Sequence, residues 1–137
     1  MAATVACTAA RLGHKILRVW WVWATTSGTT SASGGSTTFP ITGEILGIKA
    51  EPDGTNKPAD NYDVTIVDAI NGMDVLNSDA INLPQALTGV GNIRVPVDSQ
   101  NSRPIYLVDE TLSFAGTALN GGAGDSAGTF YIYIREP

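Results

Sequence analysis

The sequence has few of the residues on which catalytic sites, metal sites and disulfide-linked folds depend. Its 137 residues include one cysteine, Cys7, and one histidine, His14. A single cysteine excludes an intrachain disulfide, so the fold must depend on its core or on neighbouring subunits, and folding inside a cell is expected. There is no G-x-S-x-G, H-E-x-x-H or P-loop spacing, and histidines and cysteines are too few for a zinc site. We therefore predict a non-enzymatic protein with no catalytic residues, metal ligands or cofactor.

Charged residues are also scarce. They make up 15% of the chain, and 8 Lys+Arg against 13 Asp+Glu give a formal net charge of -5. Binding to nucleic acid through its phosphates requires a basic patch, so a nucleic-acid partner is not expected. An average soluble domain has about 25% charged residues. Here Ser, Thr, Asn and Gly must cover the surface instead, which suits a protein in contact with other subunits.

Long apolar runs are missing as well. The longest, Val19 to Ala24, is far too short to cross a bilayer, and the N-terminus lacks a basic segment followed by a continuous apolar stretch. We therefore expect neither a membrane partner nor an export signal.

The residues that are present predict an all-β protein. β-branched and aromatic residues form short runs separated by Gly, Pro, Asn and Asp, which is typical of a sandwich or barrel. We predict one domain over residues 1–137, a β-sandwich or jelly-roll-like fold of six to seven antiparallel strands with long Gly/Ser/Thr loops. Strands are expected at Lys15–Thr25, Phe39–Ala50, Ile105–Thr117 and Gly128–Glu136, with a hairpin over Tyr62–Leu76 that turns at Asn71-Gly72.

Alternation within these strands assigns their faces. In the first, Trp21 and Trp23 point one way and Trp20 and Val22 the other, and both sets are apolar. Such a strand is either buried on both sides or has an outer face that contacts another subunit. In the hairpin and in the last strand the predicted core residues are Tyr62, Val64, Ile66, Phe130, Ile132 and Ile134. Tyr131 and Tyr133 are expected to point outward.

Two segments are predicted to be flexible loops. Residues Thr25 to Thr38 are all Ser, Thr or Gly except Ala32, a composition that cannot form a core and is typical of an exposed hairpin tip. Residues Asn77 to Pro104 show no sustained period. Within them we predict a short helical turn near Ser78–Asn82 and a strand near Asn92–Val97.

Carboxylates offer the remaining chemistry. Five aspartates near turns could supply oxygen ligands to Ca²⁺, namely Asp53, Asp60, Asp63, Asp68 and Asp74. Their spacing matches no EF-hand loop, and aspartates in turns normally bind their own backbone, so no metal site is predicted. Asp109 and Glu110 are adjacent on a strand and point to opposite faces, so they cannot act together as a glycosidase pair.

The tryptophans suggest two uses. Flat aromatic rings bind sugars, but these lie in mid-strand within an apolar run, which favours packing in a core or a subunit interface. The candidate interface residues are Trp20, Val22, Trp21, Trp23, Tyr131 and Tyr133.

A family resemblance extends over most of the chain. The string NYDVTIVDAINGMDVLN (Asn61–Asn77), preceded by ITGEILGIKAEPDG and followed by a Gly-rich loop and GTFYIYI, resembles small virion structural proteins of tailed bacteriophages. The resemblance implies a capsid decoration or cement protein that binds the major capsid protein or neighbouring virion subunits, or else a head-tail connector or tail ring protein. It further implies a virion location after assembly in the host cytoplasm, and homo-oligomers that also bind other virion proteins. The alternatives are a carbohydrate-binding or receptor-contacting β-sandwich module and, more remotely, a hydrolase.

Overall fold

The protein is an all-β structure of two antiparallel sheets. The computed structural model describes residues 3–86, 92–98, 103–121 and 124–137. In these residues the strands are β1 (Ala3–Gly13), β2 (Ile16–Thr25), β3 (Ala32–Gly34), β4 (Ile41–Pro52), β5 (Asp63–Asp68), β6 (Ile93–Arg94), β7 (Tyr106–Glu110), β8 (Leu112–Thr117) and β9 (Ser126–Arg135). The predicted β-sandwich is therefore confirmed.

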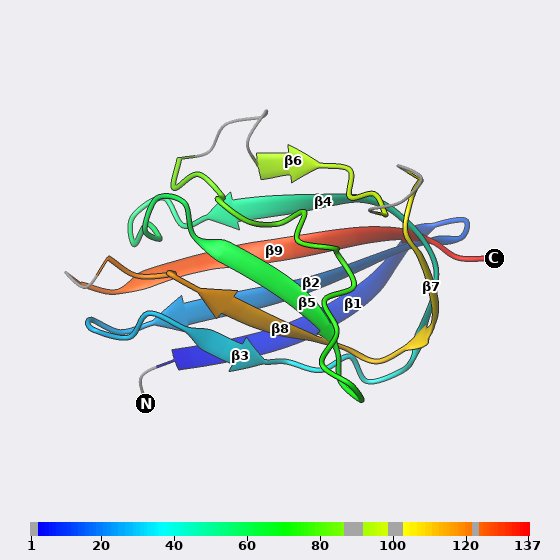
Figure 1. The fold of residues 1–137 in the computed structure, drawn as a ribbon, viewed down its shortest axis with the longest axis horizontal. Helices are drawn as coiled ribbons and strands as arrows, with labels where there is room; N and C mark the ends of the chain where they lie inside the picture. The colour runs from blue at the N-terminus through cyan, green and yellow to red at the C-terminus, as the bar shows by residue number, and fades with distance from the viewer. Residues whose placement is uncertain (1–2, 87–91, 99–102, 122–123) are drawn as a thin grey trace.

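The larger sheet has six strands and the smaller has three. The order in the larger sheet is β1-β2-β9-β4-β6, with β7 also paired to β4, and the order in the smaller is β3-β8-β5. Figure 1 shows the smaller sheet lying across one face of the larger, with β1 at the edge of the larger sheet. The opposite face of the larger sheet, which we call the outer face, is not covered by the smaller sheet.

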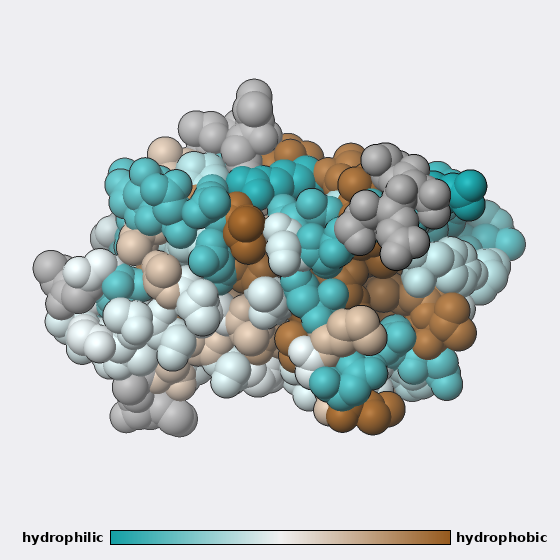
Figure 2. Space-filling model, viewed as in Figure 1, coloured by the Kyte–Doolittle hydropathy of each residue, from teal (hydrophilic) through white to brown (hydrophobic). Residues whose placement is uncertain are grey.

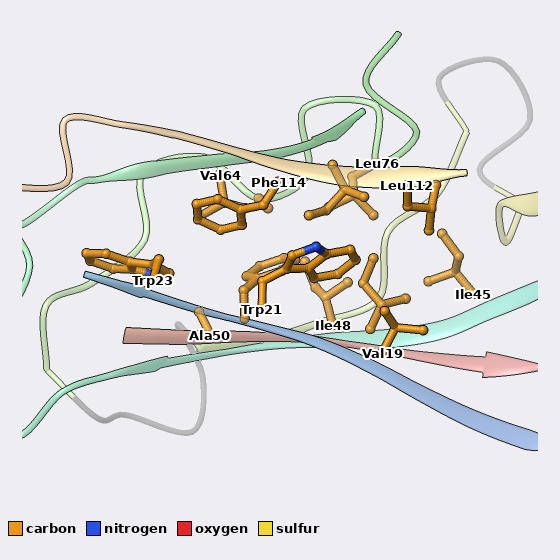
Figure 3. Close-up of a cluster of buried hydrophobic side chains, with 14 of the residues drawn as sticks. Val19, Trp21, Trp23, Ile45, Ile48, Ala50, Val64, Leu76, Leu112 and Phe114 are labelled. Atoms are coloured by element: carbon orange, nitrogen blue, oxygen red, sulfur yellow. The ribbon is translucent and has the colours of Figure 1, made fainter. Parts of the chain in front are cut away.

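The core fills the space between the sheets. Alternate residues of β2 and β9 enter it, so Trp21, Phe130 and Ile132 are at most 1% exposed. The smaller sheet contributes Val64 and Phe114, which face Trp21 and Trp23 in Figure 3. The predicted core residues of the hairpin and of the last strand are all buried, namely Tyr62, Val64, Ile66, Phe130, Ile132 and Ile134.

Two strands lie where the sequence did not indicate them. The small-residue run at the N-terminus forms β1, which pairs with the whole of β2 from Ala3↔Thr25 onward. The segment expected to be an exposed loop contains β3, which pairs with β8. The same segment packs against the core, because Gly35 accepts a hydrogen bond from the Trp21 indole N–H. A Cβ at Gly35 would lie 2.9 Å from the Trp21 ring, and its φ of 67° also favours glycine.

The predicted strand Ile105–Thr117 is two strands. It is interrupted at Thr111, after which β7 in the larger sheet gives way to β8 in the smaller one. Asp109 adopts a φ of 55° within β7, where the pairing of β7 with β4 is irregular.

The predicted hairpin over Tyr62–Leu76 has one regular strand, β5, and its return is a single bridge, Val67↔Asp74. The Asp74 carboxylate accepts hydrogen bonds from the amides of Ile66, Leu76 and Ser78, which turns the chain away from the sheet. An Asn-Gly pair favours a type I′ turn, in which both residues have positive φ. Asn71 is not among the residues with positive φ, so this turn is not of type I′.

The region from Asn77 to Pro104 is described only in part, because residues 87–91 and 99–102 lie outside the described residues. The expected helical turn near Ser78–Asn82 is a series of turns and bends. Within it, Ala80 is fully buried. The expected strand near Asn92–Val97 is reduced to β6, which pairs with Ile48 and Lys49 of β4.

Candidate interface on the outer face of the larger sheet

The structure separates the candidate interface residues into two groups. Trp21 and Trp23 are 0% and 1% exposed in the core, so their assignment to an interface is corrected: neither can contact a partner in this fold. Trp20 and Val22 lie on the outer face, where Val22 is 49% exposed. Adjacent strand residues point to opposite faces, and only one face of β2 is covered by the smaller sheet.

Strand register brings the outward residues of β2 and β9 together. Trp20 is paired with Tyr131 and Arg18 with Tyr133, which places all four side chains on the outer face. The Trp20 and Tyr131 ring centroids are 6.3 Å apart and tilted by 32°. Tyr131 and Tyr133 stack at 6.3 Å with 19° between their planes. These distances are typical of favourable aromatic pairs, so the three rings form one continuous surface.

Two cations lie on this aromatic surface. The Arg18 guanidinium carbon is 4.5 Å from the centroid of the Trp20 ring and 5.7 Å from that of Tyr131. The Lys49 ammonium, on the neighbouring strand β4, is 5.5 Å from the Tyr131 centroid. Both lie within cation–π range.

The two cations differ in their carboxylate partners. Lys49 forms an ion pair with Glu51 at 3.1 Å, and its hydrogen bond to that carboxylate raises the Lys49 pKa. The Arg18 side chain has no ion pair or hydrogen bond within the described part of the chain, and its Nε is buried without a partner. The Nη groups of Arg18 are not among the buried atoms without a partner, so they are the part of the guanidinium that is an open donor on this surface.

A hollow lies next to the aromatic surface. It has a volume of about 240 Å³ and is lined by Val22, Glu51, Pro52, Gly128 and Thr129, with Asp53, Gly54 and Ala127 at its margin. Val22 is paired with Thr129, so the hollow continues the row of outward residues on β2 and β9. A partner side chain could enter here next to the rings.

Cys7 and His14, the single cysteine and the single histidine of the chain, do not belong to this surface. His14 is exposed in the turn between β1 and β2. Cys7 points inward from β1 and packs at the margin of the core. Burial raises the Cys7 pKa to about 11, so the group is a thiol and not a reactive thiolate near neutral pH.

The aspartates near turns organise the loops. Asp53 accepts hydrogen bonds from the amides of Thr55 and Asn56, which lowers its pKa. Asp60, Asp63, Asp68 and Asp74 each accept at least one backbone amide in the same way. Within the described residues, no three His, Cys, Asp or Glu side chains come together as possible metal ligands.

Glu110 lies next to Asp68. The pKa of Glu110 is raised, first because burial desolvates its carboxyl group and second because the Asp68 charge is nearby. Asp109 is exposed on the same strand. Asp109 and Glu110 therefore do not face a common glycosidic bond.

Other apolar side chains are exposed on the side of the smaller sheet. Figure 2 shows this side, with brown surface at the tip of the turn after β5 and around β7. Its residues include Ile70 at 86% and Val108 at 65% exposure. Met73 and Tyr106 are also exposed and line one hollow with Val75, Ile105 and Leu107, but the described residues of this side do not form a stacked aromatic surface.

Comparisons with known proteins supply no relative. No family model matches the chain, and no curated protein or solved structure is significantly similar to it. Among the described residues, no helix has the length and hydropathy needed to span a membrane. The functional argument therefore depends on the surface itself.

Sequence reasoning identified Trp20, Val22, Tyr131 and Tyr133 but missed the two cations. Arg18 lies two residues before Trp20 and therefore on the same face of the strand, and this spacing was the available signal. Lys49 could not be placed, because its proximity to Tyr131 depends on the pairing of β4 with β9.

Proposed function

We propose that the protein is a non-enzymatic structural subunit of a tailed-phage virion, a capsid decoration or cement protein that binds a neighbouring virion subunit through the outer face. The observation that carries the binding surface is the Arg18 guanidinium, held on Trp20 and Tyr131 without a carboxylate partner. The virion setting rests on the sequence resemblance. A head-tail connector or tail ring subunit would use the same surface.

The chemistry of the face specifies its partner. Tyr, Trp and Arg are enriched at protein interfaces, where they supply most of the binding energy. A planar guanidinium is suited to a carboxylate, which it binds through two parallel hydrogen bonds. We therefore expect an aspartate or glutamate of the partner to contact Arg18, and a partner side chain to enter the hollow next to Val22.

A sugar is the less suitable ligand. Only one of the three tryptophans, Trp20, lies on a surface, and Arg18 is stacked over its ring at 4.5 Å. A sugar ring would have to displace this cation to stack on Trp20. A carbohydrate-binding module remains the second candidate, supported by the outward positions of Tyr131 and Tyr133.

The test measures incorporation of variants into particles. Arg18→Ala removes the open donor, and Val22→Lys places a charge next to the hollow. Loss of a charge-assisted hydrogen bond of about 1.5–3 kcal/mol predicts roughly 10- to 100-fold weaker incorporation of Arg18→Ala. Val22→Lys should lose incorporation while its monomer unfolds at nearly the wild-type denaturant concentration, because a half-exposed position tolerates lysine.

Arg103→Ala is the matched control, because Arg103 is an exposed arginine outside the outer face. It should incorporate normally. Normal incorporation of both Arg18→Ala and Val22→Lys would contradict the proposal. Retention on a glycan array that Trp20→Ala abolishes, without any particle binding, would establish the sugar-binding alternative.

A further inference from the structure

β1 forms an edge of the larger sheet, and the backbone N–H and C=O groups on its outer side are unpaired within the described residues. β1 is 11 residues long and pairs with β2 on one side. Within the described residues, no backbone hydrogen bond joins its other side to any segment. Figure 1 shows β1 as the last strand on this side of the sheet.

The other edges are covered or short. β4 is covered by β6 and β7. β5 is covered by the segment after it, which donates and accepts backbone hydrogen bonds at Val64, Ile66 and Asp68. β3 is three residues long. The N–H and C=O groups of β1 are therefore the longest open edge that the structure describes.

β1 also lacks the features that protect edge strands. Natural edges avoid pairing through lysine, proline, bulges or short length. The stretch from Ala3 to Ala10 has no charge and no proline, and its pairing with β2 is regular. The irregularity comes later, between Arg11 and Gly13, and Arg11 is bound by the Glu136 carboxylate at 3.0 and 3.1 Å. The uncharged stretch thus has no charge, proline or bulge that would prevent pairing with a further strand.

We propose that β1 pairs antiparallel with β1 of a second copy of this chain, so that two larger sheets join into one continuous sheet. This goes beyond the proposed function, because the β1 edge is a different site from the outer face, and it rests on that function for its setting in a particle.

The Ala3–Ala10 edge suits a second copy as the occupant, because it carries no charge in a chain whose net charge of -5 otherwise makes two copies repel each other. The outward side chains Thr4, Ala6, Thr8 and Ala10 are small, so an identical strand fits against them without a clash. Antiparallel pairing about the middle of this stretch also places the two Arg11 side chains at opposite ends.

The expected pair is weak. Eight residues form an edge about 27 Å long, and pairing along it buries much less than the roughly 1,200 Å² of a standard interface. Dissociation constants in the micromolar to millimolar range follow, so the pair forms at high protein concentration or where copies are held together in a particle.

The first measurement is sedimentation of the full chain over a range of concentrations. Thr4→Lys/Thr8→Lys brings like charges together across the pair and should weaken the dimer at least about tenfold. Ile70→Lys/Thr117→Lys adds the same charge on exposed residues of the smaller-sheet side and should leave the dimer unchanged. Circular dichroism establishes that both variants fold.

The second measurement determines strand direction. Nitroxide labels are placed singly at Thr4, Ala6, Thr8 and Ala10 in a Cys7→Ser background, and distances between copies are measured by electron paramagnetic resonance. Antiparallel pairing predicts a minimum within the stretch and an increase of about 14 Å for each two-residue step away from it.

A monomer at every concentration, a dimer that the lysines on β1 leave intact, or label distances that do not vary along β1 would overturn the inference. Arg18→Ala separates this result from the proposed function, because it should lose particle binding and keep the dimer. Loss of the dimer in Arg18→Ala would place self-association on the outer face instead of on β1.

Discussion

Trp20 and Trp21 are adjacent in the sequence, but their replacement by alanine should have different effects. Trp21 is 0% exposed in the core, whereas Trp20 lies partly exposed on the outer face. The pair is well controlled, because both variants remove the same atoms from the same strand. Trp21→Ala should destabilise the fold, and Trp20→Ala should mainly impair partner binding.

The magnitudes follow from the contacts. Burial of a tryptophan removes roughly 200 Å² from water, and truncation of such a residue to alanine costs about 3–5 kcal/mol. The hydrogen bond from the Trp21 indole to Gly35 is lost as well, so the upper part of that range is expected. Trp20→Ala loses the contact with Tyr131 and the stacked Arg18, which together contribute about 1–2 kcal/mol.

Urea unfolding followed by circular dichroism measures both free energies of unfolding, and particle incorporation measures binding. The expected difference between the variants is at least about 2 kcal/mol, with weaker incorporation of Trp20→Ala. Equal destabilisation by the two substitutions, or greater destabilisation by Trp20→Ala, would refute the assignment of faces on β2.

Two further predictions concern the segment with β3 and the Cys7 thiol. Replacing Ser31–Ser36 with a short glycine turn should lower the free energy of unfolding by more than about 2 kcal/mol, because β3 pairing and the Gly35 bond are lost; an unchanged unfolding curve would show that the segment is only a loop. The Cys7 pKa is raised from 9.0 to about 11, so between these pH values the unfolded chain binds fewer protons and stability falls as pH rises. After discounting for partial exposure, wild type should lose about 1 kcal/mol more than Cys7→Ser between pH 8.5 and 11 in urea titrations, and equal losses would contradict the pKa.

Alternation was sufficient to predict the buried faces of β5 and β9. Their core residues recur at every second position, and the burial of Ile66 and Ile132 follows that period. Candidate interface residues on β2 and β9 could therefore be predicted. The sequence did not indicate which face of β2 would be covered, because both are apolar, so Trp21 and Trp23 were included with Trp20 and Val22.

The parts that could not be predicted depend on contacts between distant segments. β1 consists largely of Ala and Thr, and it becomes a strand because β2 offers it a complete pairing edge. β3 has almost no apolar side chains, and its order comes from pairing with β8 and from the contact of Gly35 with Trp21. The open donor at Arg18 likewise appears only when β2 and β9 are in register.

The most direct test of the proposed interface is a cryo-electron microscopy structure of the purified particle that contains this chain. The account predicts that the outer face lies against a neighbouring subunit, that a carboxylate of that subunit contacts Arg18, and that Trp20, Tyr131 and Tyr133 are buried in the contact. A particle in which this face is open to solvent would contradict it.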